Sequence, residues 1–439
     1  MANLESLALE ICSQVSEISK TLAADSTPAP SFEEDSFADF ESSRGRADLG
    51  LRDARNKLIN CAQDIVRLVS GPTDQILTLA YSVTDAANLG TVVRFNIPQA
   101  IPNGATMSAE SLAAAVGLPV DTLVRVVRFA IGNGIFNEPE RGWFGHSATS
   151  ALMARNPHVR NIALFATHEL ANILVRLPDG LKLQQELEAE QAPHAAFNVA
   201  YPDFADAFDF FQKNSLSNDR YHSYLQGRVN TSRWAVEHLI SAWDWPSVGS
   251  GTIIDCGGSV GHTCVALAPI CPNASFVVQD MSCEALASGK TWIEKEYPAL
   301  GSRIIFAEHN FFNRQPTSAD IFILRHILHD WSDADCLRIL QALVPALKDG
   351  AKVLISEAVV PEDVATRSGT LDQKQVRNED ALMLAVHNAC ERDVSGFVRL
   401  FKKASPDFQF KGVTGGNGGA FQSLLEFEFR SSAEPVVGK

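Results

Sequence analysis

A glycine-rich segment flanked by two acidic residues gives the clearest chemical signal in the sequence. The run Gly251-Thr-Ile-Ile-Asp-Cys-Gly-Gly-Ser-Val-Gly261 predicts a buried strand, a tight turn and the start of a helix. A second apolar run, Ser275-Phe-Val-Val-Gln-Asp280, also ends in an acid. Glycines let the backbone approach a ligand closely, and an acid after the second strand can accept hydrogen bonds from a ribose. The pattern predicts a nucleoside site formed by Asp255, Gly257, Gly258, Gly261 and Asp280.

The spacing of the glycines separates the possible nucleoside cofactors. A dinucleotide-binding turn needs its first glycine where this chain has Cys256, so NAD is disfavoured. No Lys-Ser or Lys-Thr pair follows the turn, which excludes a P-loop. An acid at the tip of the first strand suits a ligand with a cationic amino-acid end, such as S-adenosylmethionine. A tight strand-to-helix turn without a ligand is the alternative explanation of the glycines.

A histidine further along the chain could supply acid–base chemistry. His329 stands in Leu324-Arg-His-Ile-Leu-His-Asp-Trp-Ser-Asp-Ala-Asp335, directly after a predicted strand, where ligands of doubly wound sheets bind. The near-neutral pKa of a histidine suits removal of a proton from a phenol, whose pKa is about 10. Glu357 and Glu391 emerge from comparable positions and could stabilise the protonated imidazole. A hydrogen-bonded loop histidine with solvated acids nearby is the simpler alternative.

The acids that follow His329 admit two interpretations. Asp330, Asp333 and Asp335 could bind Mg²⁺, but acids at the start of a helix explain them better. Ser332, with Asp335 three residues later, predicts a capping box that opens the next helix. We therefore expect no metal site here.

These residues require a fold that brings the ends of several strands together. From about residue 248 onward the pattern alternates between strands and helices, which predicts a doubly wound α/β sheet. Strands are expected at 252–256, 275–279, 303–307, 319–324, 351–356, 408–412 and 421–429. Helices are expected at 261–270, 283–296, 334–347, 378–387 and 394–404. The last strand follows a glycine-rich turn and is expected to pair antiparallel in a hairpin.

The N-terminal part of the chain is predicted to be helical. Residues 4–24 have apolar side chains at helical spacing, which predicts an amphipathic helix. Residues 25–50 are rich in Pro, Ser and acids and predict a flexible linker. A run of helices is expected at about 55–95.

The next segment has a more specific pattern. Residues 108–148 predict a helix, a turn, a second helix with Asp121 as its N-cap, and a short hairpin, which together form a winged-helix arrangement. DNA binding is disfavoured, because the second helix exposes little basic surface and the whole chain carries a net charge of −15. Residues 156–245 are helical and rich in aromatic side chains, which predicts core packing or the wall of an apolar pocket.

Size and composition set broader limits. A chain of 439 residues suggests two or three domains, and 46% hydrophobic with 20% charged residues is typical of a globular protein. No apolar run approaches the roughly 18 residues of a membrane span, and the N-terminus has acids where a signal peptide would have positive charge. The eight cysteines include no Cys-x-x-Cys pair, so reduced thiols in a cytoplasmic protein are expected.

The order of the motifs resembles that of the plant and fungal O-methyltransferases of the caffeate and sterigmatocystin type. The shared features are the glycine turn, His329-Asp-Trp-Ser-Asp333, Ser356-Glu-x-x-x-Pro361, Met383-Leu and Glu391-Arg. The resemblance covers about residues 55–430 and includes the winged-helix module, which forms the dimer and caps the substrate pocket in that family. It implies a methyltransferase fold, S-adenosylmethionine as cofactor, a homodimer and a small aromatic or polyketide-like acceptor.

Site residues follow from the resemblance position by position. His329 is similar to the family's catalytic base, and Glu357 and Glu391 to the carboxylates beside it. The implied cofactor site consists of Asp255, Gly257, Gly258, Gly261, Asp280, Met281, Asn310, Phe311 and Arg325. The implied acceptor site consists of Phe165, His168, Asp330, Met383, His387 and Asn388.

Two residues differ from the family pattern. Ser259 stands where the family usually has a third glycine, and Asn310 stands where it usually has an acid near the adenine. These differences leave an alternative open, because some fungal relatives of this fold catalyse pericyclic or dehydration steps instead of methyl transfer. Such an enzyme would keep the cofactor pocket without transferring a methyl group.

The sequence thus predicts a metal-independent O-methyltransferase that acts on a phenolic or enolic hydroxyl of a secondary metabolite. Neither a nucleic acid nor a membrane is expected as a partner. The expected division of the chain is an N-terminal helix and acidic linker (1–50), a winged-helix dimerisation domain (51–155), a helical connector lining the substrate pocket (156–247), a cofactor-binding catalytic domain (248–430) and a tail (431–439).

Overall fold

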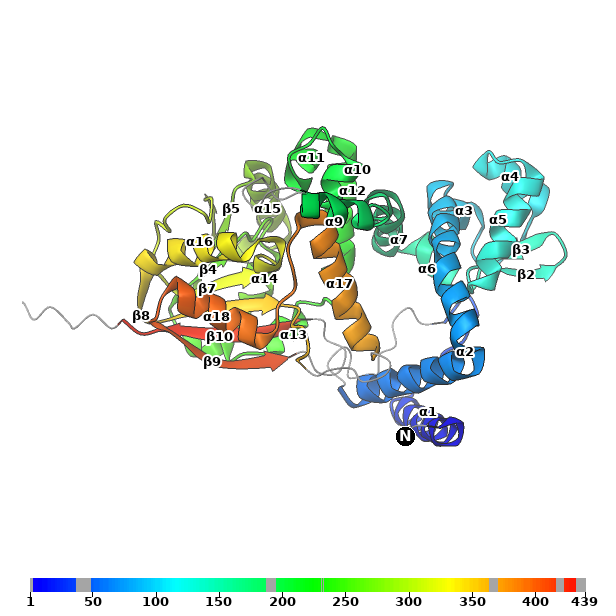
Figure 1. Cartoon of the computed structure of the whole chain (residues 1–439), viewed down its shortest axis with the longest axis horizontal. Coiled ribbons are helices and arrows are strands. Elements are labelled where there is room, and N and C mark those ends of the chain that lie inside the picture. Colours follow the sequence, from blue (N-terminus) through cyan, green and yellow to red (C-terminus); the bar gives the residue numbers. More distant parts are fainter. Residues whose placement is uncertain are drawn as a thin grey trace, which may run out of the picture. The chain divides into compact units, whose positions relative to one another are not determined.

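The computed structural model shows two compact units, formed by residues 1–233 and 234–439 (Figure 1). The boundary falls inside the predicted connector, and the finer division of the chain stays a prediction. The structure describes residues 3–36, 49–186, 195–229, 231, 233–362, 370–415 and 422–431.

Two long helices open the first unit. Helix α1 (Leu4–Ala24) matches the predicted amphipathic helix, and the Asn3 side chain caps it by accepting a hydrogen bond from the backbone N–H of Ser6. Most of the predicted linker, 37–48, lies outside the described residues. Helix α2 (Leu49–Arg94) follows and is interrupted at Gly71, whose φ of 68° is not helical.

The middle of α2 exposes an unusual amount of apolar surface. Eight large apolar side chains between positions 66 and 83 are at least 49% exposed, namely Val66, Leu68, Val69, Ile76, Leu77, Leu79, Tyr81 and Val83. By length and composition, the stretch Gly50–Arg94 could also cross a membrane, which the sequence analysis did not anticipate, and only 17% of its most apolar window is buried. Such a surface normally contacts a partner.

A winged-helix arrangement follows α2, as predicted. The two helices are α4 (Ala109–Val116) and α5 (Val120–Gly132). The other elements are α3 (Ile97–Ala100), β1 (Met107–Ser108), β2 (Asn137–Glu140) and β3 (Trp143–Gly145), and the strands form a small sheet in the order β1-β3-β2. The predicted N-cap of α5 is wrong. Pro119 occupies that position because its fixed φ suits the helix start, and Asp121 lies inside the first turn.

The rest of the first unit is helical, as expected. Its elements are α6 (Ala148–Arg155), α7 (Pro157–Phe165), a π-helical turn η1 (Ala166–Leu170), α8 (Ala171–Leu174), α9 (Leu177–Glu186), α10 (Ala196–Ala200), α11 (Ala207–Lys213) and α12 (Ser215–Val229). Phe165 is almost fully buried, with its ring centroid 4.7 Å from that of Tyr224. The aromatic side chains around Phe165 therefore pack a local core.

The second unit is built on a seven-stranded sheet in the order β6-β5-β4-β7-β8-β10-β9. The strands are β4 (Thr252–Cys256), β5 (Ser275–Asp280), β6 (Ile304–Glu308), β7 (Ala319–Arg325), β8 (Leu347–Glu357), β9 (Phe408–Gly415) and β10 (Ser423–Phe429). Strands β4 to β8 pair in parallel, and β10 pairs antiparallel with both β8 and β9. This arrangement confirms the predicted doubly wound sheet and its terminal hairpin.

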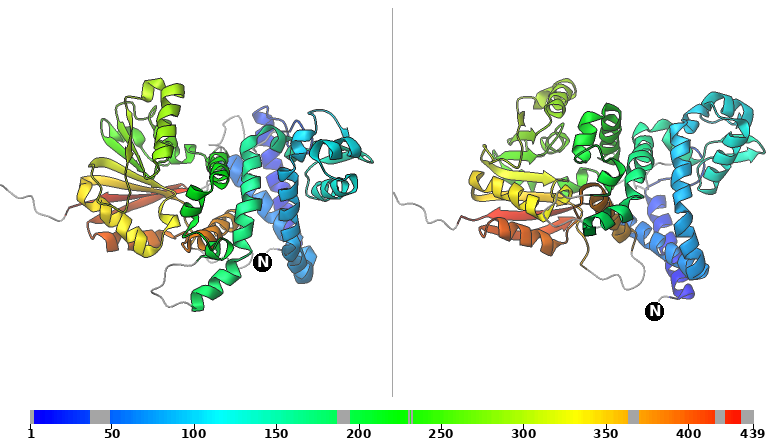
Figure 2. Two further views of the ribbon diagram at one scale, coloured as in Figure 1. Left: turned by 90° about the horizontal axis from the view of Figure 1, so that it is seen from above. Right: turned by 45° about the horizontal axis from the view of Figure 1, so that its top comes forward.

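Helices cover both faces of this sheet (Figure 2). The helices of the second unit are α13 (Glu237–Ser241), α14 (His262–Leu267), α15 (Cys283–Glu296), α16 (Asp333–Leu343), α17 (Leu371–His387) and α18 (Val394–Ala404), with short 3₁₀ turns η2 (Trp245–Val248), η3 (Pro298–Leu300), η4 (Leu328–Asp330) and η5 (Val344–Ala346). Of these, α17 extends beyond the sheet and does not cover a face of it (Figure 1). Buried side chains of β4, β7 and β8, among them Ile254, Phe322 and Val353, form the core against α16 and α18.

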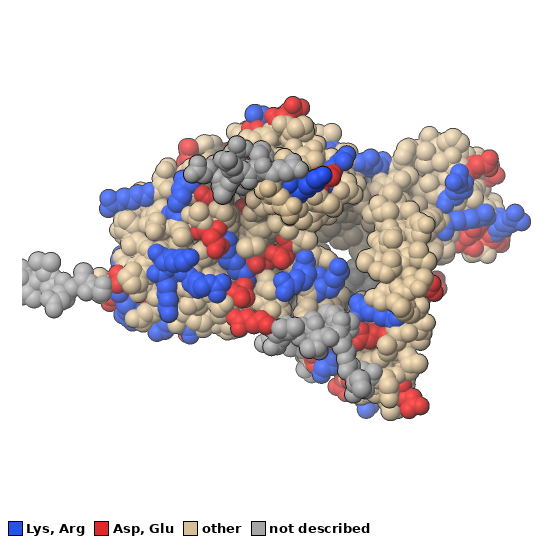
Figure 3. Space-filling model, in the orientation of Figure 1, with Lys and Arg blue, Asp and Glu red and all other residues tan. Residues whose placement is uncertain are grey.

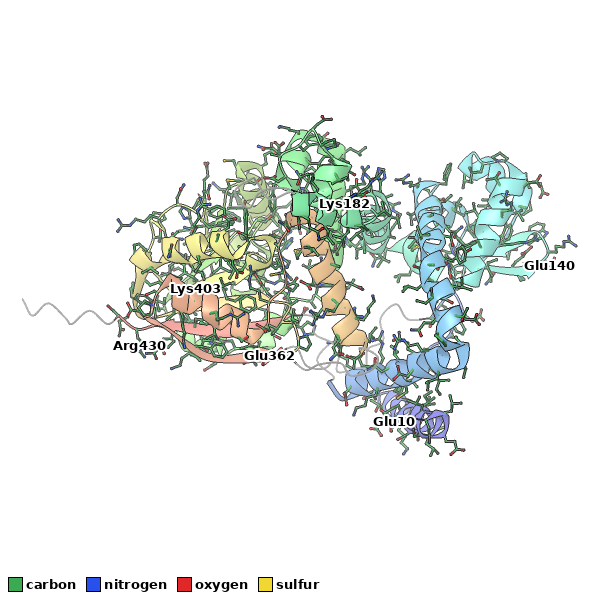
Figure 4. The ribbon with its side chains drawn as sticks, in the orientation of Figure 1. Glu10, Glu140, Lys182, Glu362, Lys403 and Arg430 are labelled. Carbon is green, nitrogen blue, oxygen red and sulfur yellow. The ribbon has the colours of Figure 1, made fainter. Side chains whose placement is uncertain are left out.

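The direction of the strands sets which edge of the sheet can hold a ligand. Figure 4 shows Glu362 and Arg430 near opposite ends of the sheet. Glu362 follows the carboxyl end of β8, whereas Arg430 follows β10 and pairs with Asp349 at the start of β8. Parallel sheets bind ligands at the carboxyl edge, beside the point where the strand order reverses. Here that point lies between β4 and β7.

Candidate active site

The glycine turn after β4 packs tightly onto its own sheet. The backbone N–H groups of Gly257 and Gly258 both donate to the carbonyl of Gln279 on β5, at 2.8 and 2.9 Å. A Cβ atom on Gly258 would lie 2.7 Å from Oδ2 of Asp255, and Gly257 has a φ of 72°. The glycines are therefore needed for the turn to close over Asp255 as well as for a ligand to approach it.

The two acids of the predicted nucleoside site have different environments. Asp255 is 2% exposed, and burial raises its pKa to about 6 although the charge of Arg325 and a hydrogen bond from Thr263 act in the opposite direction. Asp280 is only partly buried at the end of β5. Its Oδ2 accepts from the backbone N–H of Ser259 at 2.9 Å and its Oδ1 from that of Ser282 at 2.8 Å. These two bonds fix the Asp280 carboxylate at the rim of the glycine turn.

Ser259 adopts a conformation that favours glycine. Its φ is 51°, in the left-handed region, where a side chain is strained. The hydrogen bond to Asp280 holds this conformation, which explains how a serine is accommodated at the third glycine position of the family pattern.

The loop after β6 brings two more predicted cofactor residues to the same turn. A Cβ atom on Gly257 would lie 3.7 Å from a ring carbon of Phe311, so this aromatic ring borders the glycine turn. Asn310 accepts from the backbone N–H of Phe312 through Oδ1 at 3.0 Å, which anchors the loop. Met281 is 67% exposed. The roles of Asn310, Phe311 and Met281 in binding a cofactor stay predictions.

Arg325 ends β7 beside the turn. Its Nε donates to Oε1 of Gln422 at 3.4 Å, and its Nη2 donates to the carbonyl of Trp234 at 3.3 Å. Gln422 also accepts from the Ser356 hydroxyl at 3.2 Å and contacts the His326 ring. Gln422 is not among the predicted site residues, because nothing near it in the chain indicates that it reaches the ends of β7 and β8.

His329 lies on η4, the short turn that follows β7. Its side chain is 7% exposed. Nδ1 is 2.7 Å from Oε1 of Glu391, a length typical of a charge-assisted hydrogen bond. Because Nδ1 carries the proton in this bond, the neutral ring presents the Nε2 lone pair on its other side. The structure thus brings together His329 and one of the two predicted carboxylates.

Glu357 acts on His329 through its charge, which raises the pKa of the imidazole, and also through the backbone of the turn. Its Oε1 accepts from the backbone N–H groups of Ile327 and Leu328, at 3.1 and 2.6 Å, and no hydrogen bond joins it to the imidazole within the described part of the chain. Glu357 is fully buried, so burial raises its pKa to about 7, while the charge of His329 acts in the opposite direction. Its carboxylate holds the turn that carries the ring.

A comparison of two buried histidines shows how neighbouring carboxylates change the pKa of an imidazole. Burial lowers the pKa of His146, whose ring contacts a hydroxyl and a carbonyl. Burial acts in the same direction on His329, but the charges of Asp330 and Glu391 outweigh it and raise the pKa to about 10. His329 is therefore a strong base that binds a proton tightly.

Asp333 and Asp335, which follow His329 in the chain, bond other residues of the protein. Ser332 caps α16 by accepting from the backbone N–H of Asp335, which is one half of the predicted capping box; the Asp335 carboxylate accepts from the Ser332 hydroxyl instead of the Ser332 backbone N–H. Asp333 accepts from Arg392 at 2.9 Å. Within the described ranges, no group of three or more His, Cys, Asp or Glu side chains is placed to hold a metal ion.

The predicted acceptor residues fall into two groups. In the second unit, Asp330 Oδ1 lies 3.6 Å from Nε2 of both His329 and His387. Asn388 ends α17 in a left-handed conformation, and Met383 is 9% exposed on the same helix. These positions are compatible with an acceptor site beside His329, which stays a prediction.

Phe165 and His168 belong to the first unit. Phe165 packs in the local core described above, and Nδ1 of His168 contacts the Arg94 guanidinium. Their contribution to acceptor binding also stays a prediction.

Comparisons with known proteins agree with this architecture. The family model for the O-methyltransferase domain matches residues 183–406. The O-methyltransferase VdtC of Byssochlamys spectabilis is 30% identical over 354 residues, which is 80% of each chain. The chain belongs to the O-methyltransferase family. It is therefore an enzyme, and S-adenosylmethionine is the cofactor of its family.

Solved structures support the fold. The crystal structure of OxaC in complex with SAH and oxaline matches with a TM-score of 0.73 and 20% identity, covering 97% of this enzyme and all of OxaC. The structure of a pericyclic reaction enzyme matches with the same TM-score and 18% identity, covering 96% of this enzyme and 99% of that chain. The fold is thus shared by proteins with different reactions, and it does not by itself select one.

The residues at the carboxyl edge fit an S-adenosyl ligand. The glycine turn carries no side chains at positions 257 and 258, and Asp280 keeps an oriented carboxylate at its rim. A carboxylate held in this way can accept from a ribose diol, since each oxygen has a lone pair beyond the one used by the backbone. A ring carbon of Phe311 borders Gly257, so the edge of the turn is apolar on that side.

Proposed function

We propose that the enzyme methylates a phenolic or enolic hydroxyl of a polyketide-like fungal secondary metabolite, with His329 as the general base. The single observation that carries this proposal is the buried contact between His329 Nδ1 and Glu391 Oε1 at 2.7 Å, which leaves Nε2 to accept a proton. VdtC is a fungal O-methyltransferase, and the OxaC structure contains the small molecule oxaline, so both are consistent with methyl transfer to a small-molecule acceptor.

His329 and Glu391 would have separate roles in such a reaction. When bound, the cofactor supplies a methyl group on a positively charged sulfur. His329 Nε2 takes the acceptor's hydroxyl proton, and Glu391 stabilises the resulting imidazolium through Nδ1–H. A phenol has a pKa of about 10, close to that of His329, so the proton transfer between them is nearly balanced. Holding two reactants in line supplies most of the remaining rate gain.

Metabolite profiling of a host that lacks this gene tests the reaction. We expect a compound to accumulate that is lighter than the normal product by one methyl group, and we expect the purified enzyme to convert it with release of S-adenosylhomocysteine. An accumulated isomer or a hydrated precursor, converted without S-adenosylhomocysteine, would instead indicate the pericyclase or dehydratase alternative.

We also propose that the enzyme is a homodimer that uses the exposed middle of α2. Between positions 66 and 84 the only charged side chains are Arg67 and Asp74, so this surface is nearly neutral in a chain of net charge −15. Figure 3 shows mostly uncharged surface over α2. Two acidic copies repel one another least where they are uncharged. A lipid surface would favour a helix rich in Lys and Arg, which α2 is not.

Charged substitutions on α2 test the dimer. The double variant Ile76→Lys/Leu79→Lys should sediment as a monomer at micromolar concentration, whereas the parent enzyme sediments as a dimer. Ile305→Lys is the matched control, because Ile305 is 58% exposed on β6 and lies in the other unit. A parent enzyme that is monomeric, or that binds neutral lipid vesicles through α2, would contradict the proposal.

We propose a cytoplasmic location for the enzyme. All eight cysteines are free thiols, five of them buried or partly buried, which is consistent with a reducing compartment.

A further inference from the structure

Arg392 makes a set of contacts around His329 that the reaction scheme above does not use. Arg392 is buried, with 6% of the residue exposed. Nη1 donates to the carbonyl of Leu328 and Nη2 to the carbonyl of Trp331, both at 2.8 Å. Leu328 immediately precedes His329 in the chain, and Trp331 follows two residues later. One planar group therefore bonds the backbone on both sides of the proposed base.

The N–H side of the same turn is held by Glu357. Its Oε1 accepts from Ile327 and Leu328, at 3.1 and 2.6 Å. The backbone from 327 to 331 is thus bonded by a buried carboxylate through its N–H groups and by a buried guanidinium through its carbonyls. A turn that carries charge-assisted bonds on both sides has little freedom to rotate.

Arg392 is also adjacent in the chain to Glu391, the residue that bonds the His329 ring. It directly follows Glu391, whose Oε1 contacts His329 Nδ1, and the pair is anchored at two points. The Glu391 backbone N–H donates to Asp380 of α17 at 3.0 Å, and the Arg392 carbonyl accepts from Val360 after β8 at 3.0 Å. Adjacent residues therefore fix the imidazole and the backbone beneath it.

We propose that Arg392 is a positioning residue for methyl transfer, acting through His329. The inference rests on the proposed role of His329 as the base. Arg392 sets the height and tilt of η4 so that the ring meets Glu391 on one side and the acceptor on the other. A shift of about 1 Å in a reacting group can lower a rate by about 100-fold. Loss of Arg392 should therefore lower kcat while cofactor binding is preserved.

The effect should be partial, because the same carbonyls have a second, weaker donor. The thiol of Cys336 lies 3.2 Å from the Leu328 carbonyl and 3.5 Å from that of Trp331. A thiol is a weak donor with a single proton, so it can bond one of these carbonyls at a time and does not fix their direction. The turn should then persist without Arg392 and vary in position.

Kinetics of the full-length enzyme test the proposal, with S-adenosylmethionine and the compound that accumulates in the host lacking this gene as substrates. For Arg392→Met, we expect kcat to fall about 10- to 100-fold, with KM for the acceptor changed less than about threefold and the affinity for S-adenosylhomocysteine unchanged. Arg392→Lys retains a cation and can still bond one of the two carbonyls, so it should recover a measurable part of kcat. It also tests the proposal if Arg392→Met does not fold.

Arg303→Met is a matched control. Arg303 is another partly buried guanidinium of the same unit, and it also donates to backbone carbonyls, those of Ala268, Cys271 and Ala274. It lies at the start of β5 and β6, away from the carboxyl edge. We expect Arg303→Met to lower thermal stability without the selective loss of kcat. Equal losses of kcat in the two variants would overturn the proposal, since both would then reflect stability.

A double variant that combines Arg392→Met with His329→Ala tests the positioning role of Arg392 separately from the role of His329 as the base. If Arg392 acts through His329, Arg392→Met should have little further effect on kcat in the alanine background. An undiminished effect there would overturn the positioning role. If His329→Ala itself leaves kcat unchanged, the assignment of the base fails. If His329→Ala is costly but Arg392→Met is not, only the present inference fails.

Discussion

Replacing His329 with alanine should lower kcat by about 10²- to 10⁴-fold, the range that a positioned general base contributes. The expected loss is large because His329 Nε2 is the proposed proton acceptor and its other ring nitrogen is already bonded to Glu391. The affinity for S-adenosylhomocysteine, measured by calorimetry, should not change, because Asp280 bonds Ser259 and Ser282 whereas the His329 ring bonds Glu391. A kcat within about threefold of the parent would contradict the assignment of the base.

The pH dependence of kcat/KM tests whether the neighbouring carboxylates raise the pKa of His329. A base works only when deprotonated, and the pKa of His329 is raised to about 10, so kcat/KM should increase with pH across the neutral range and level off near that value. Glu391→Gln removes one of the charges that raise this pKa. The rise should then move to lower pH, with a lower plateau because the imidazolium is less stabilised.

His146→Ala is a matched control for this prediction. His146 is also buried, at 3% exposure, but its partners are the Ser150 hydroxyl and the Ile101 carbonyl in the winged-helix module. Its loss should lower the melting temperature and leave the pH dependence of kcat/KM unchanged. The contrast would separate the loss of a buried ring from the loss of a base.

Much of the catalytic unit could be predicted from the sequence because its signals are local. The strands are short apolar runs bounded by turn residues, and each of the seven expected strands overlaps an observed one. The glycine turn follows from the φ angles that only glycine adopts without strain. The capping of α16 by Ser332 is another local signal. Helix α17 begins at Leu371, earlier than predicted. Thr370 and Gln373 form a capping box there, a local signal that could have placed this start correctly.

Contacts between distant residues could not be predicted in the same way. The order of the motifs placed Glu357 and Glu391 beside His329, but it did not distinguish a carboxylate that bonds the ring from one that bonds the backbone. Glu391 bonds the ring, whereas Glu357 bonds the N–H groups of the turn. Arg392 was visible only as part of a motif, because its carbonyl partners are more than sixty positions away in the chain. Such side-chain directions depend on packing that spacing does not encode.

Replacing Asp280 with alanine should weaken the binding of S-adenosylhomocysteine by about 100-fold or more. The Asp280 carboxylate accepts from the backbone N–H groups of Ser259 and Ser282, at 2.9 and 2.8 Å. A hydrogen bond to a charged group contributes about 1.5–3 kcal/mol, and about 1.4 kcal/mol corresponds to a tenfold change in affinity. Ser259, with its φ of 51°, would also lose the bond that holds its strained conformation.

Two variants decide whether the loss arises at the cofactor site. Asp280→Asn keeps one acceptor oxygen and should give an intermediate affinity in the same calorimetric titration. Asp320→Ala is the matched control, because the Asp320 carboxylate also accepts from a backbone N–H, that of Thr252 at 2.8 Å, but at the opposite edge of the sheet. We expect its affinity for S-adenosylhomocysteine to equal that of the parent. If Asp320→Ala and Asp280→Ala weaken binding equally, the effect is one of general stability, and Asp280 does not bind the cofactor. If only Asp280→Ala weakens it, the carboxyl edge between β4 and β6 is the cofactor site, and His329 at the end of β7 is placed to act on an acceptor beside it.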